Sequence, residues 1–199
     1  MAERYGANKR QIGLFGGSFN PIHRGHIALA RYLLQHTTLD EIWFVISPQN
    51  PLKNLNELLN NEARLLMVEC ALANEPQMKT CTVEFEMPLP SYTWNTLKTL
   101  DERFPDATFT LLIGGDNWES FPRWYRHDEI IANYHIIVYP RPGATISGNR
   151  LPAHVSIVEA PLLDISSTAI RQRISEGKDI DEMVPDGVGK LIREYGYYR

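Results

Sequence analysis

The chain has 199 residues, a formal net charge of −4 and two cysteines, Cys70 and Cys81. This length favours one domain with a substantial core, and the acidic balance gives no support to general nucleic-acid binding, which usually needs a basic patch. The cysteines lack a metal-like spacing, the first residues contain no signal-like apolar segment, and no apolar run approaches ~20 residues, so we expect a reduced, cytoplasmic protein without a membrane partner.

The stretch 12–26 changes from a strand pattern to a helical pattern. A short apolar run stops at Gly16 and Gly17, and after Pro21 apolar residues return at spacings of three and four along 25–35. We therefore predict a strand, a glycine loop and a helix in that order. The free N–H groups and the dipole of a helix N-terminus favour an anion such as phosphate, and glycines let the backbone approach it.

Two histidines mark the start of this predicted helix. His23 and His26 are three residues apart and share one face, where imidazoles can donate hydrogen bonds to phosphate oxygens and, when protonated, add charge. The P-loop and the dinucleotide-binding glycine pattern both fail, because Arg24-Gly25-His26 replaces Gly-Lys-Ser and Phe15 breaks the first glycine pair. Surface histidines or half of a zinc site are the alternatives, but no third ligand has a recognisable spacing. The loop thus favours phosphate over a purely structural turn.

Downstream, strand patterns alternate with helical patterns. Strands are predicted at 41–47, 80–85, 108–113, 134–139 and 154–158, and helices at 58–72, after an N-cap at Ser91, and from about 165 onward. A glycine turn that carries a carboxylate is expected at 114–118. This alternation predicts an α/β protein whose mostly parallel sheet has helices on both faces.

Two further cationic positions follow a strand or begin a helix. Lys53 lies on a proline-bounded loop just past the carboxyl end of the strand at 41–47, where open α/β sheets bind ligands. The Ser-Ser-Thr run at 166–168 offers hydroxyls at a helix N-terminus, with Arg171 in the first turn or so. This second group is either another anion site or an ordinary serine cap with a solvated arginine.

The two anion-binding stretches together resemble the signature pair of a known superfamily. Gly-Ser-Phe-Asn-Pro-Ile-His-Arg-Gly-His at 17–26 and Ile-Ser-Ser-Thr-Ala-Ile-Arg at 165–171 are similar to the HxGH and ISSTxxR motifs of the nucleotidyltransferases related to class I aminoacyl-tRNA synthetases. Within that superfamily the chain resembles most the bacterial nicotinate-mononucleotide adenylyltransferases. The further markers are Ser-Tyr-Thr-Trp at 91–94, Ile-Gly-Gly-Asp at 113–116, Phe-Pro-Arg-Trp-Tyr at 121–125, Arg-Pro-Gly at 141–143 and Val-Pro-Asp-Gly-Val at 184–188.

The resemblance implies one nucleotidyltransferase domain over 1–199, with a Rossmann-like twisted parallel sheet in a core of about 10–160 and a small helical part at about 165–199. It implies that ATP and nicotinate mononucleotide react, with magnesium, to give nicotinate adenine dinucleotide and pyrophosphate in NAD biosynthesis. Attack of one phosphate on another brings anions together, so the protein must supply positioning and cations rather than a covalent nucleophile. A homo-oligomer is an open option.

Site residues follow position by position from the resemblance. The catalytic set would be His23, His26, Lys53 and Arg171, with His26 near the α-phosphate and Lys53 between the phosphates of the two substrates. ATP would contact Gly16, Gly17, Ser18, Phe19, His23, His26, Gly115, Asp116, Ser167, Thr168 and Arg171, the last three at the β- and γ-phosphates and Gly115 and Asp116 beside the ribose. Nicotinate mononucleotide would contact Ser18, Lys53, Thr93, Trp124 and Tyr125, with the indole stacked on the pyridine ring. No residue is assigned as a metal ligand, and Asp116 is a candidate for the magnesium network only.

One departure and several alternatives stay open. Many relatives carry Pro-Pro-His-Lys where this chain has Asn50-Pro-Leu-Lys53, so any role of that histidine is absent at Leu52. The same fold can take nicotinamide mononucleotide or phosphopantetheine as acceptor, although Thr93 and the Trp124-Tyr125 pair favour the acid. Core packing is the ordinary alternative for Trp124. An idle nucleotide-binding module is the alternative from another class, and the retained catalytic cations argue against it.

Overall fold

The computed structural model describes residues 9–48, 58–141, 143, 151–161 and 164–199. In this part of the chain six parallel strands form one sheet in the order β3-β2-β1-β4-β5-β6. They are β1 (Arg10–Gly17), β2 (Glu41–Ile46), β3 (Met78–Cys81), β4 (Ala107–Gly114), β5 (His135–Tyr139) and β6 (Val155–Ile157). The predicted parallel sheet is confirmed, and its order reverses between β1 and β4, where open α/β sheets bind ligands.

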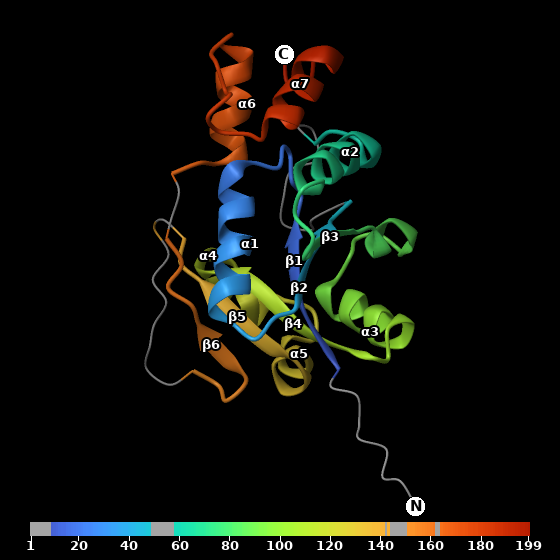
Figure 1. Cartoon of the computed structure of the whole chain (residues 1–199). Helices are drawn as coiled ribbons and strands as arrows, with labels where there is room; N and C mark the ends of the chain where they lie inside the picture. The colour runs from blue at the N-terminus through green and yellow to red at the C-terminus, as the bar shows by residue number, and fades with distance from the viewer. Residues whose placement is uncertain (1–8, 49–57, 142, 144–150, 162–163) are drawn as a thin grey trace, which may run out of the picture.

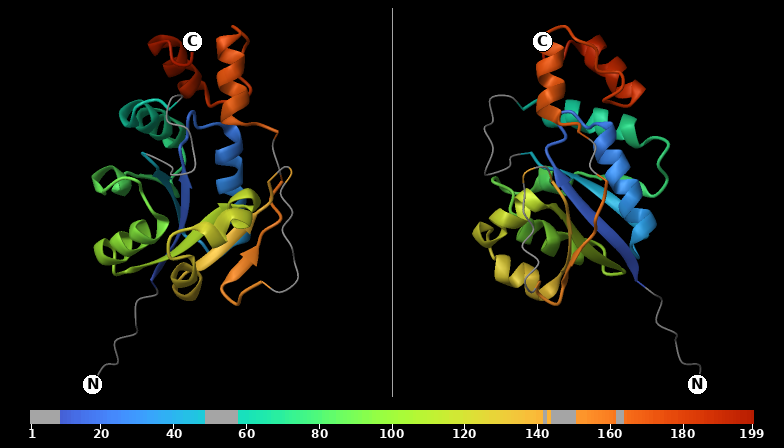
Figure 2. Two further views of the ribbon diagram at one scale, coloured as in Figure 1. Left: turned by 180° about the vertical axis from the view of Figure 1, so that it is seen from behind. Right: turned by 90° about the vertical axis from the view of Figure 1, so that its left-hand side faces the viewer.

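Helices cover both faces of the sheet, as the alternating pattern predicts (Figures 1 and 2). On one face lie α1 (Arg24–His36) and α2 (Asn61–Leu72), and on the other lie α3 (Thr93–Arg103) and α5 (His127–Asn133). The short helices are η2 (Val83–Glu86), α4 (Gly115–Ser120) and η3 (Phe121–Arg123). The chain ends with α6 (Ser167–Ser175), capped by Ser166, and α7 (Asp186–Tyr195), at the end of the molecule opposite the start of β1. Within the described ranges, no helix has both the length and the apolar character needed to cross a bilayer.

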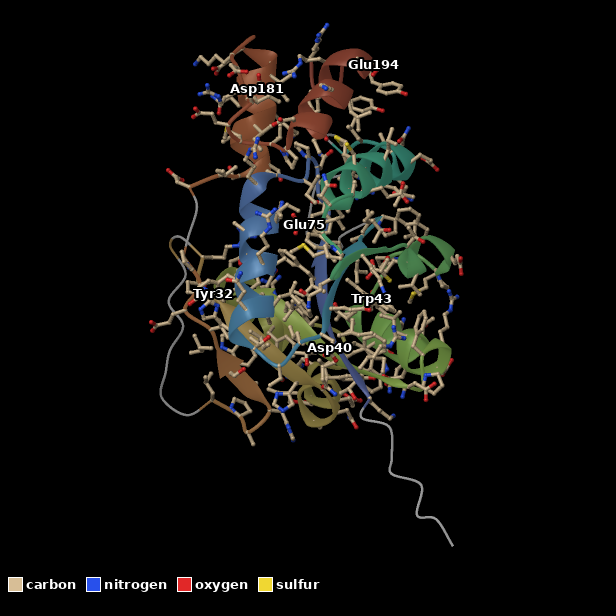
Figure 3. The ribbon with its side chains drawn as sticks, in the orientation of Figure 1. Tyr32, Asp40, Trp43, Glu75, Asp181 and Glu194 are labelled. Atoms are coloured by element: carbon tan, nitrogen blue, oxygen red, sulfur yellow. The ribbon has the colours of Figure 1, made fainter. Side chains whose placement is uncertain are left out.

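The strands bury side chains on both faces because successive residues point to opposite sides of a sheet. In β2, Phe44 and Ile46 belong to the core under α1 and α2, whereas Trp43 and Val45 belong to the core under α3 and α5. Figure 3 shows Trp43 beside α3, where its ring meets Phe104 at a centroid distance of 4.9 Å. The continuous apolar run of β2 therefore reflects a strand that is covered on both sides.

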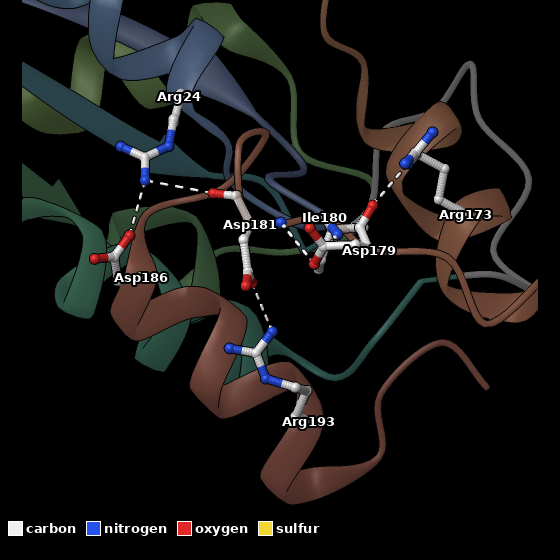
Figure 4. Close-up of polar contacts among 7 residues, drawn as sticks. All are labelled: Arg24, Arg173, Asp179, Ile180, Asp181, Asp186 and Arg193. Carbon is white, nitrogen blue, oxygen red and sulfur yellow. Dashed lines mark hydrogen bonds and ion pairs between the residues drawn. The ribbon is translucent and has the colours of Figure 1, made fainter.

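The C-terminal helices share a core with the sheet. Ile170 of α6 and Val188 and Ile192 of α7 are at most 2% exposed and pack in the cluster under α1 and α2. Polar contacts join the same region to the start of α1, since Arg24 pairs with Asp186 at 2.8 Å (Figure 4). Thus α6 and α7 complete the core on this face of the sheet.

Some local predictions are wrong. The strand expected at 80–85 ends at Cys81, and η2 follows, because β3 lies at the edge of the sheet and pairs with β2 alone over four residues in the described structure. Ser91 is not the N-cap of α3: Tyr92 takes that position, and Ser91 is buried. The expected glycine turn at 114–118 is instead the end of β4 followed at once by α4, which begins at Gly115.

Candidate active site

The turn between β1 and α1 brings the two histidines together at the N-terminus of α1. His23 is the N-cap residue, and His26 is the third residue of the helix. Their rings stack with centroids 3.6 Å apart, and the His23 amide donates a hydrogen bond to His26 Nδ1 at 3.2 Å. Because Nδ1 accepts this bond, the neutral His26 ring carries its proton on Nε2 and offers a donor to a phosphate oxygen.

Burial keeps His23 neutral. Its side chain is 3% exposed, and burial together with the nearby Arg141 guanidinium lowers its pKa to about 4. Its Nδ1 atom has no hydrogen-bond partner among the described residues. His23 therefore presents a neutral imidazole at neutral pH, and the positive charge that a protonated ring would add is absent.

Gly16 and Phe19, at the two ends of the glycine loop, differ in their exposure. Gly16 is exposed, and a side chain at this position would meet no atom within 4 Å, so open space adjoins the end of β1. Phe19, which we expected to contact ATP, is 2% exposed and packs its ring against Phe15 and Phe44. Its φ of 44° is left-handed, which is costly for a bulky residue and is maintained by the surrounding contacts. Phe19 is thus limited to backbone contacts with a nucleotide.

The two predicted anion-binding stretches meet in one place. Ser167 Oγ donates to the Pro21 carbonyl at 2.9 Å, and Arg171 Nη1 donates to the Asn20 carbonyl at 3.0 Å. Thr168 lies next to Ser167 on the exposed side of α6. The start of α6 is therefore joined to the loop that leads into α1, although 146 and 151 residues separate the bonded groups in sequence.

A buried arginine, which sequence reasoning missed, joins this loop to β2. Arg64 of α2 is 0% exposed, and its guanidinium donates to the carbonyls of Ser18 and Ser47, each at 2.8 Å. A sequence signal exists, because Arg64 lies three and four residues before the buried Met67 and Val68 and so shares their helix face. A buried guanidinium thus holds the carboxyl ends of β1 and β2 together.

The residues expected to bind the pyridine line a cavity. Thr93, Trp124 and Tyr125 border a space of about 190 Å³, together with Gly16 and Gly17 at the end of β1. The Trp124 ring also contacts the ring of the buried Phe121 at a centroid distance of 5.4 Å. Trp124 therefore combines core packing with a place on the cavity wall. The phosphate loop and the pyridine residues border the same space.

The cavity wall also contains a buried carboxyl group that sequence reasoning missed. Glu84 is 8% exposed, and its Oε1 accepts a hydrogen bond from Thr96 Oγ1 at 2.9 Å. Glu84 Oε2 and Ser91 Oγ make no hydrogen bond of normal geometry within the described structure. Burial raises the pKa of Glu84, although the hydroxyls of Thr96, Ser47 and Ser91 favour its ionised form. The only sequence signal is an acidic residue inside a predicted strand that leads to Ser91.

A cation also borders the residues expected beside the ribose. Gly115 is buried, and Asp116 is exposed at the start of α4. Arg141, just past the end of β5, places Nε 3.9 Å from Asp116 Oδ1 and its guanidinium over the Tyr139 ring. The same guanidinium helps to lower the pKa of His23. Arg141, for which the sequence suggested no role, therefore lies between the ribose side and the histidines.

Lys53 and Leu52 lie outside the described residues, so the predicted contact of Lys53 with both substrates' phosphates stays a prediction. In the ranges that are described, no three histidine, cysteine or carboxylate side chains gather in a way that could hold a metal ion. The zinc alternative for His23 and His26 therefore finds no third ligand in those ranges.

Comparison with known sequences gives a consistent result. The sequence model of the cytidylyltransferase-like family matches residues 14–173. A Bacteroides thetaiotaomicron protein named "Probable nicotinate-nucleotide adenylyltransferase" is 47% identical over 98% of this chain and 95% of its own length. A Cytophaga hutchinsonii protein of the same name is 43% identical over 94% of this chain and 98% of its own length.

Comparison with solved structures gives the same fold. The nicotinic acid mononucleotide adenylyltransferase of Plasmodium falciparum, complexed with NaAD, superposes with a TM-score of 0.79 over 95% of this chain and 97% of its own. The sequence identity is 23%, so this likeness bears on the fold alone.

Proposed function

This chain belongs to the nicotinate-nucleotide adenylyltransferases within the cytidylyltransferase-like family, and we propose that its own site transfers AMP from ATP to nicotinate mononucleotide. The products are nicotinate adenine dinucleotide and pyrophosphate. The proposed reaction is a step of NAD biosynthesis, which we place in the cytoplasm. One observation carries the proposal: Gly16 and Gly17 of the phosphate loop border the same cavity as Thr93, Trp124 and Tyr125. A ligand with a flat ring and a phosphate fits such a space.

The pyridine half is recognised in the cavity. Trp124 supplies a flat apolar surface for the ring, and Tyr125 and Thr93 border the same space. The ring fixes the orientation of nicotinate mononucleotide, so that its phosphate points toward Gly16 and Ser18 at the end of β1. Fixing two reactants in one geometry removes much of the entropic part of the barrier.

The phosphate half is recognised where α1 and α6 begin. In the reaction, an oxygen of the nicotinate mononucleotide phosphate forms a bond to the α-phosphorus of ATP, and the bond from that phosphorus to the bridging oxygen breaks. Pyrophosphate leaves with the electron pair. His26 Nε2 donates a hydrogen bond to the α-phosphate, and Ser167, Thr168 and Arg171 hold the β- and γ-phosphates, where charge grows. Lys53 neutralises the two phosphates that meet.

Magnesium fits the residues of this site. The ion prefers oxygen ligands and often keeps several waters, with one or two carboxylates and the substrate phosphates completing its shell. The exposed Asp116 carboxylate at the edge of the site would be a candidate for this shell, and the phosphates of ATP would supply the rest. When bound, magnesium neutralises phosphate charge, while Arg171 and the hydroxyls of α6 orient the same phosphates.

One observation favours a second acceptor, nicotinamide mononucleotide. Glu84 lines the cavity, and its ionised carboxylate would accept a hydrogen bond from a ring amide but repel a ring carboxylate. The acid remains the first choice because the similar sequences are named for the nicotinate nucleotide. The state of Glu84 thus decides how strongly this chain prefers the acid.

The test is pyrophosphate release from ATP and magnesium with nicotinate mononucleotide or, separately, nicotinamide mononucleotide. Release that prefers the acid supports the proposal. Release with the amide alone would retain the reaction and overturn the acceptor. No release with either would contradict both acceptors, and phosphopantetheine would be assayed next.

His26→Ala is the control for the site. Because His26 donates to the α-phosphate, we expect its removal to lower turnover about 10²–10⁴-fold without loss of the fold. Circular dichroism checks the fold, and His36→Ala, a change at an exposed histidine at the other end of α1, should leave turnover within about twofold of the wild type. Unchanged turnover in His26→Ala would remove His26 from the mechanism.

A further inference from the structure

The last residues of the chain reach the phosphate loop. Tyr198, the penultimate residue, is half-buried, and its hydroxyl donates a hydrogen bond to Asn20 Oδ1 at 2.8 Å. Asn20 is 4% exposed and lies between Phe19 and Pro21 in the first motif. A separation of 178 residues is closed by this one bond. The end of the chain therefore contacts the loop that the proposed mechanism uses.

The direction of the bond follows from the geometry of Asn20. Its Oδ1 also accepts the backbone amide of Leu59 at 3.3 Å, and an amide N–H can only donate. Oδ1 is thus the acceptor, and the Tyr198 hydroxyl must be the donor. Burial raises the pKa of Tyr198 even though the cations Arg171 and Arg64 lie near enough to oppose that shift. The phenol therefore keeps the proton that this bond requires.

The backbone of Tyr198 adopts a conformation that local sequence does not favour. Its φ of 67° lies in the left-handed region. Glycine, asparagine and aspartate adopt this region more readily, but it is unusual for a large side chain such as tyrosine. Such a conformation persists only where the surrounding contacts hold it. Here the contacts are the bond to Asn20 and the packing of the Tyr198 ring on the core under α1 and α2. The tail is therefore fixed in place, rather than simply extending from α7.

Asn20 connects Tyr198 with Arg171, one of the predicted catalytic cations. The side-chain Oδ1 of Asn20 accepts hydrogen bonds from Tyr198 and Leu59. The backbone carbonyl of Asn20 accepts a third bond, from Arg171 Nη1, at 3.0 Å. In the proposed function, Arg171 binds the β- and γ-phosphates of ATP. A shift of Asn20 would therefore move the group that orients Arg171 as well as the loop itself.

We propose that Tyr198 is a positioning residue for ATP: its hydroxyl fixes Asn20, and Asn20 holds Arg171 and the loop in the geometry that receives the phosphates. This inference rests on the phosphate site of the proposed function. It adds that the segment after α7 helps to position the groups of that site. Tyr198 touches neither substrate in this scheme and acts through Asn20.

The experiment compares Tyr198→Phe with Tyr195→Phe. The first change removes the buried hydroxyl, and the second removes an exposed one, 56% accessible as a residue, from the end of α7. Calorimetry measures the affinity of each variant for ATP and for adenosine, which has no phosphate. We expect Tyr198→Phe to weaken ATP binding about 3- to 10-fold and to leave adenosine within about twofold, as befits one hydrogen bond. Tyr195→Phe should change neither.

A double-mutant cycle tests the route through Asn20. In an Asn20→Ala background, Tyr198→Phe should weaken ATP binding no further, because the acceptor is already absent. Thermal unfolding confirms that every variant is folded at the temperature of the titrations. If Tyr198→Phe leaves ATP binding unchanged, weakens ATP and adenosine equally, or adds its full effect to that of Asn20→Ala, the inference is wrong.

These titrations are separate from the test of the proposed function. A wild-type protein that binds ATP more tightly than adenosine but releases no pyrophosphate would overturn the reaction, and the comparison of Tyr198→Phe with Tyr195→Phe would still decide the role of the tail. With an active wild type, kcat and KM for ATP provide a second readout. The loss in Tyr198→Phe should then appear in ATP binding and in kcat/KM.

Discussion

Burial gives the two histidines at the start of α1 different roles, and the difference makes stability depend on pH. The pKa of His23 is lowered to about 4 in the folded state, whereas an unfolded histidine has its ordinary value of about 6.5. Between these values the unfolded chain binds more protons than the folded one, so the free energy of unfolding falls as the pH falls. We expect His23 to lower the free energy of unfolding by about 3 kcal/mol as the pH falls from 6.5 to 4.

Urea unfolding across that pH range measures the effect. His23→Gln, which cannot titrate there, should flatten the pH dependence by about one proton. A wild-type slope in His23→Gln would show that other groups cause the acid sensitivity. Once the pH is well above 6.5 both states of His23 are neutral, so its contribution there is constant.

Glu84 predicts a pH dependence of substrate choice. Burial raises the pKa of its carboxyl group, and it becomes charged as the pH rises. A second carboxylate in the same cavity would then be repelled by about 2 kcal/mol, for a separation on the order of 8 Å and an effective dielectric constant of about 20. We expect KM for nicotinate mononucleotide to rise with pH relative to KM for nicotinamide mononucleotide.

Glu84→Gln separates this effect from other titrations. The amide keeps the shape of the side chain but cannot ionise, so the ratio of the two KM values should become independent of pH. The wild type and the variant should agree best at low pH, where Glu84 is protonated. A ratio that follows pH equally in both proteins would remove Glu84 from acceptor discrimination.

The groups that lie in short motifs were predictable from the sequence, whereas the groups that reach the site from a distance were not. Short motifs contain His23, His26 and the Trp124-Tyr125 pair, and the neighbouring glycines and aromatic residues identify those motifs. Arg64 and Tyr198 reach loop residues 46 and 178 positions away, and no local pattern records such a contact. The place of Glu84 in the cavity wall was not predictable, because Glu84 lies in a segment that the sequence predicts as a strand. In the structure this segment forms η2 at the edge of the sheet.

At the scale of elements, the packing of α7 on α2 depends on a glycine. A side chain at Gly187 would overlap the Cys70 sulfur of α2, whereas one at Gly189 would meet its nearest neighbours at 3.4–3.5 Å, an ordinary contact. We expect Gly187→Ala to destabilise the protein by about 1–3 kcal/mol through overpacking. Gly189→Ala, in the same helix, should be neutral or stabilising by up to about 1 kcal/mol, because alanine favours helices.

Urea unfolding compares these variants, and Cys70 supplies the decisive control. If the overlap is the cause, Cys70→Ala should cancel most of the loss when combined with Gly187→Ala, because the sulfur is no longer there. Additive losses in the double variant would place the cause elsewhere. Equal losses in Gly187→Ala and Gly189→Ala would likewise contradict the explanation.

The elements themselves were largely predictable, because most strands are covered on both faces and most helices have one apolar face. The continuous run at 41–47 identified β2, and the apolar spacings identified α1 and α2. Where elements begin and end was less predictable. Tyr92 replaces Ser91 as the N-cap of α3, although its side chain makes no capping hydrogen bond, so the capping preference for serine does not predict this start.

At the scale of the molecule, the two cores share one set of strands. The cluster under α3 and α5 includes Trp43, with Trp94, Trp118 and Trp124 packed against it, whereas α6 and α7 pack in the cluster on the other face. Alternate residues of β1, β2, β4 and β5 enter each cluster, so neither core can lose its strands without exposing the other. The protein is therefore expected to unfold as one domain.

Urea unfolding with two probes tests this expectation, since tryptophan fluorescence reports one core and amide exchange in α7 reports the other. We expect both to give the same midpoint and the same free energy of unfolding, as two-state behaviour requires. The exposed Arg24–Asp186 ion pair supplies a contrast, because Arg24→Ala should cost at most about 1 kcal/mol and should not separate the transitions. Exchange of α7 at lower urea than the fluorescence change would mean that the C-terminal helices form a separate unit, held to the sheet by weaker contacts than their buried Ile170, Val188 and Ile192 imply.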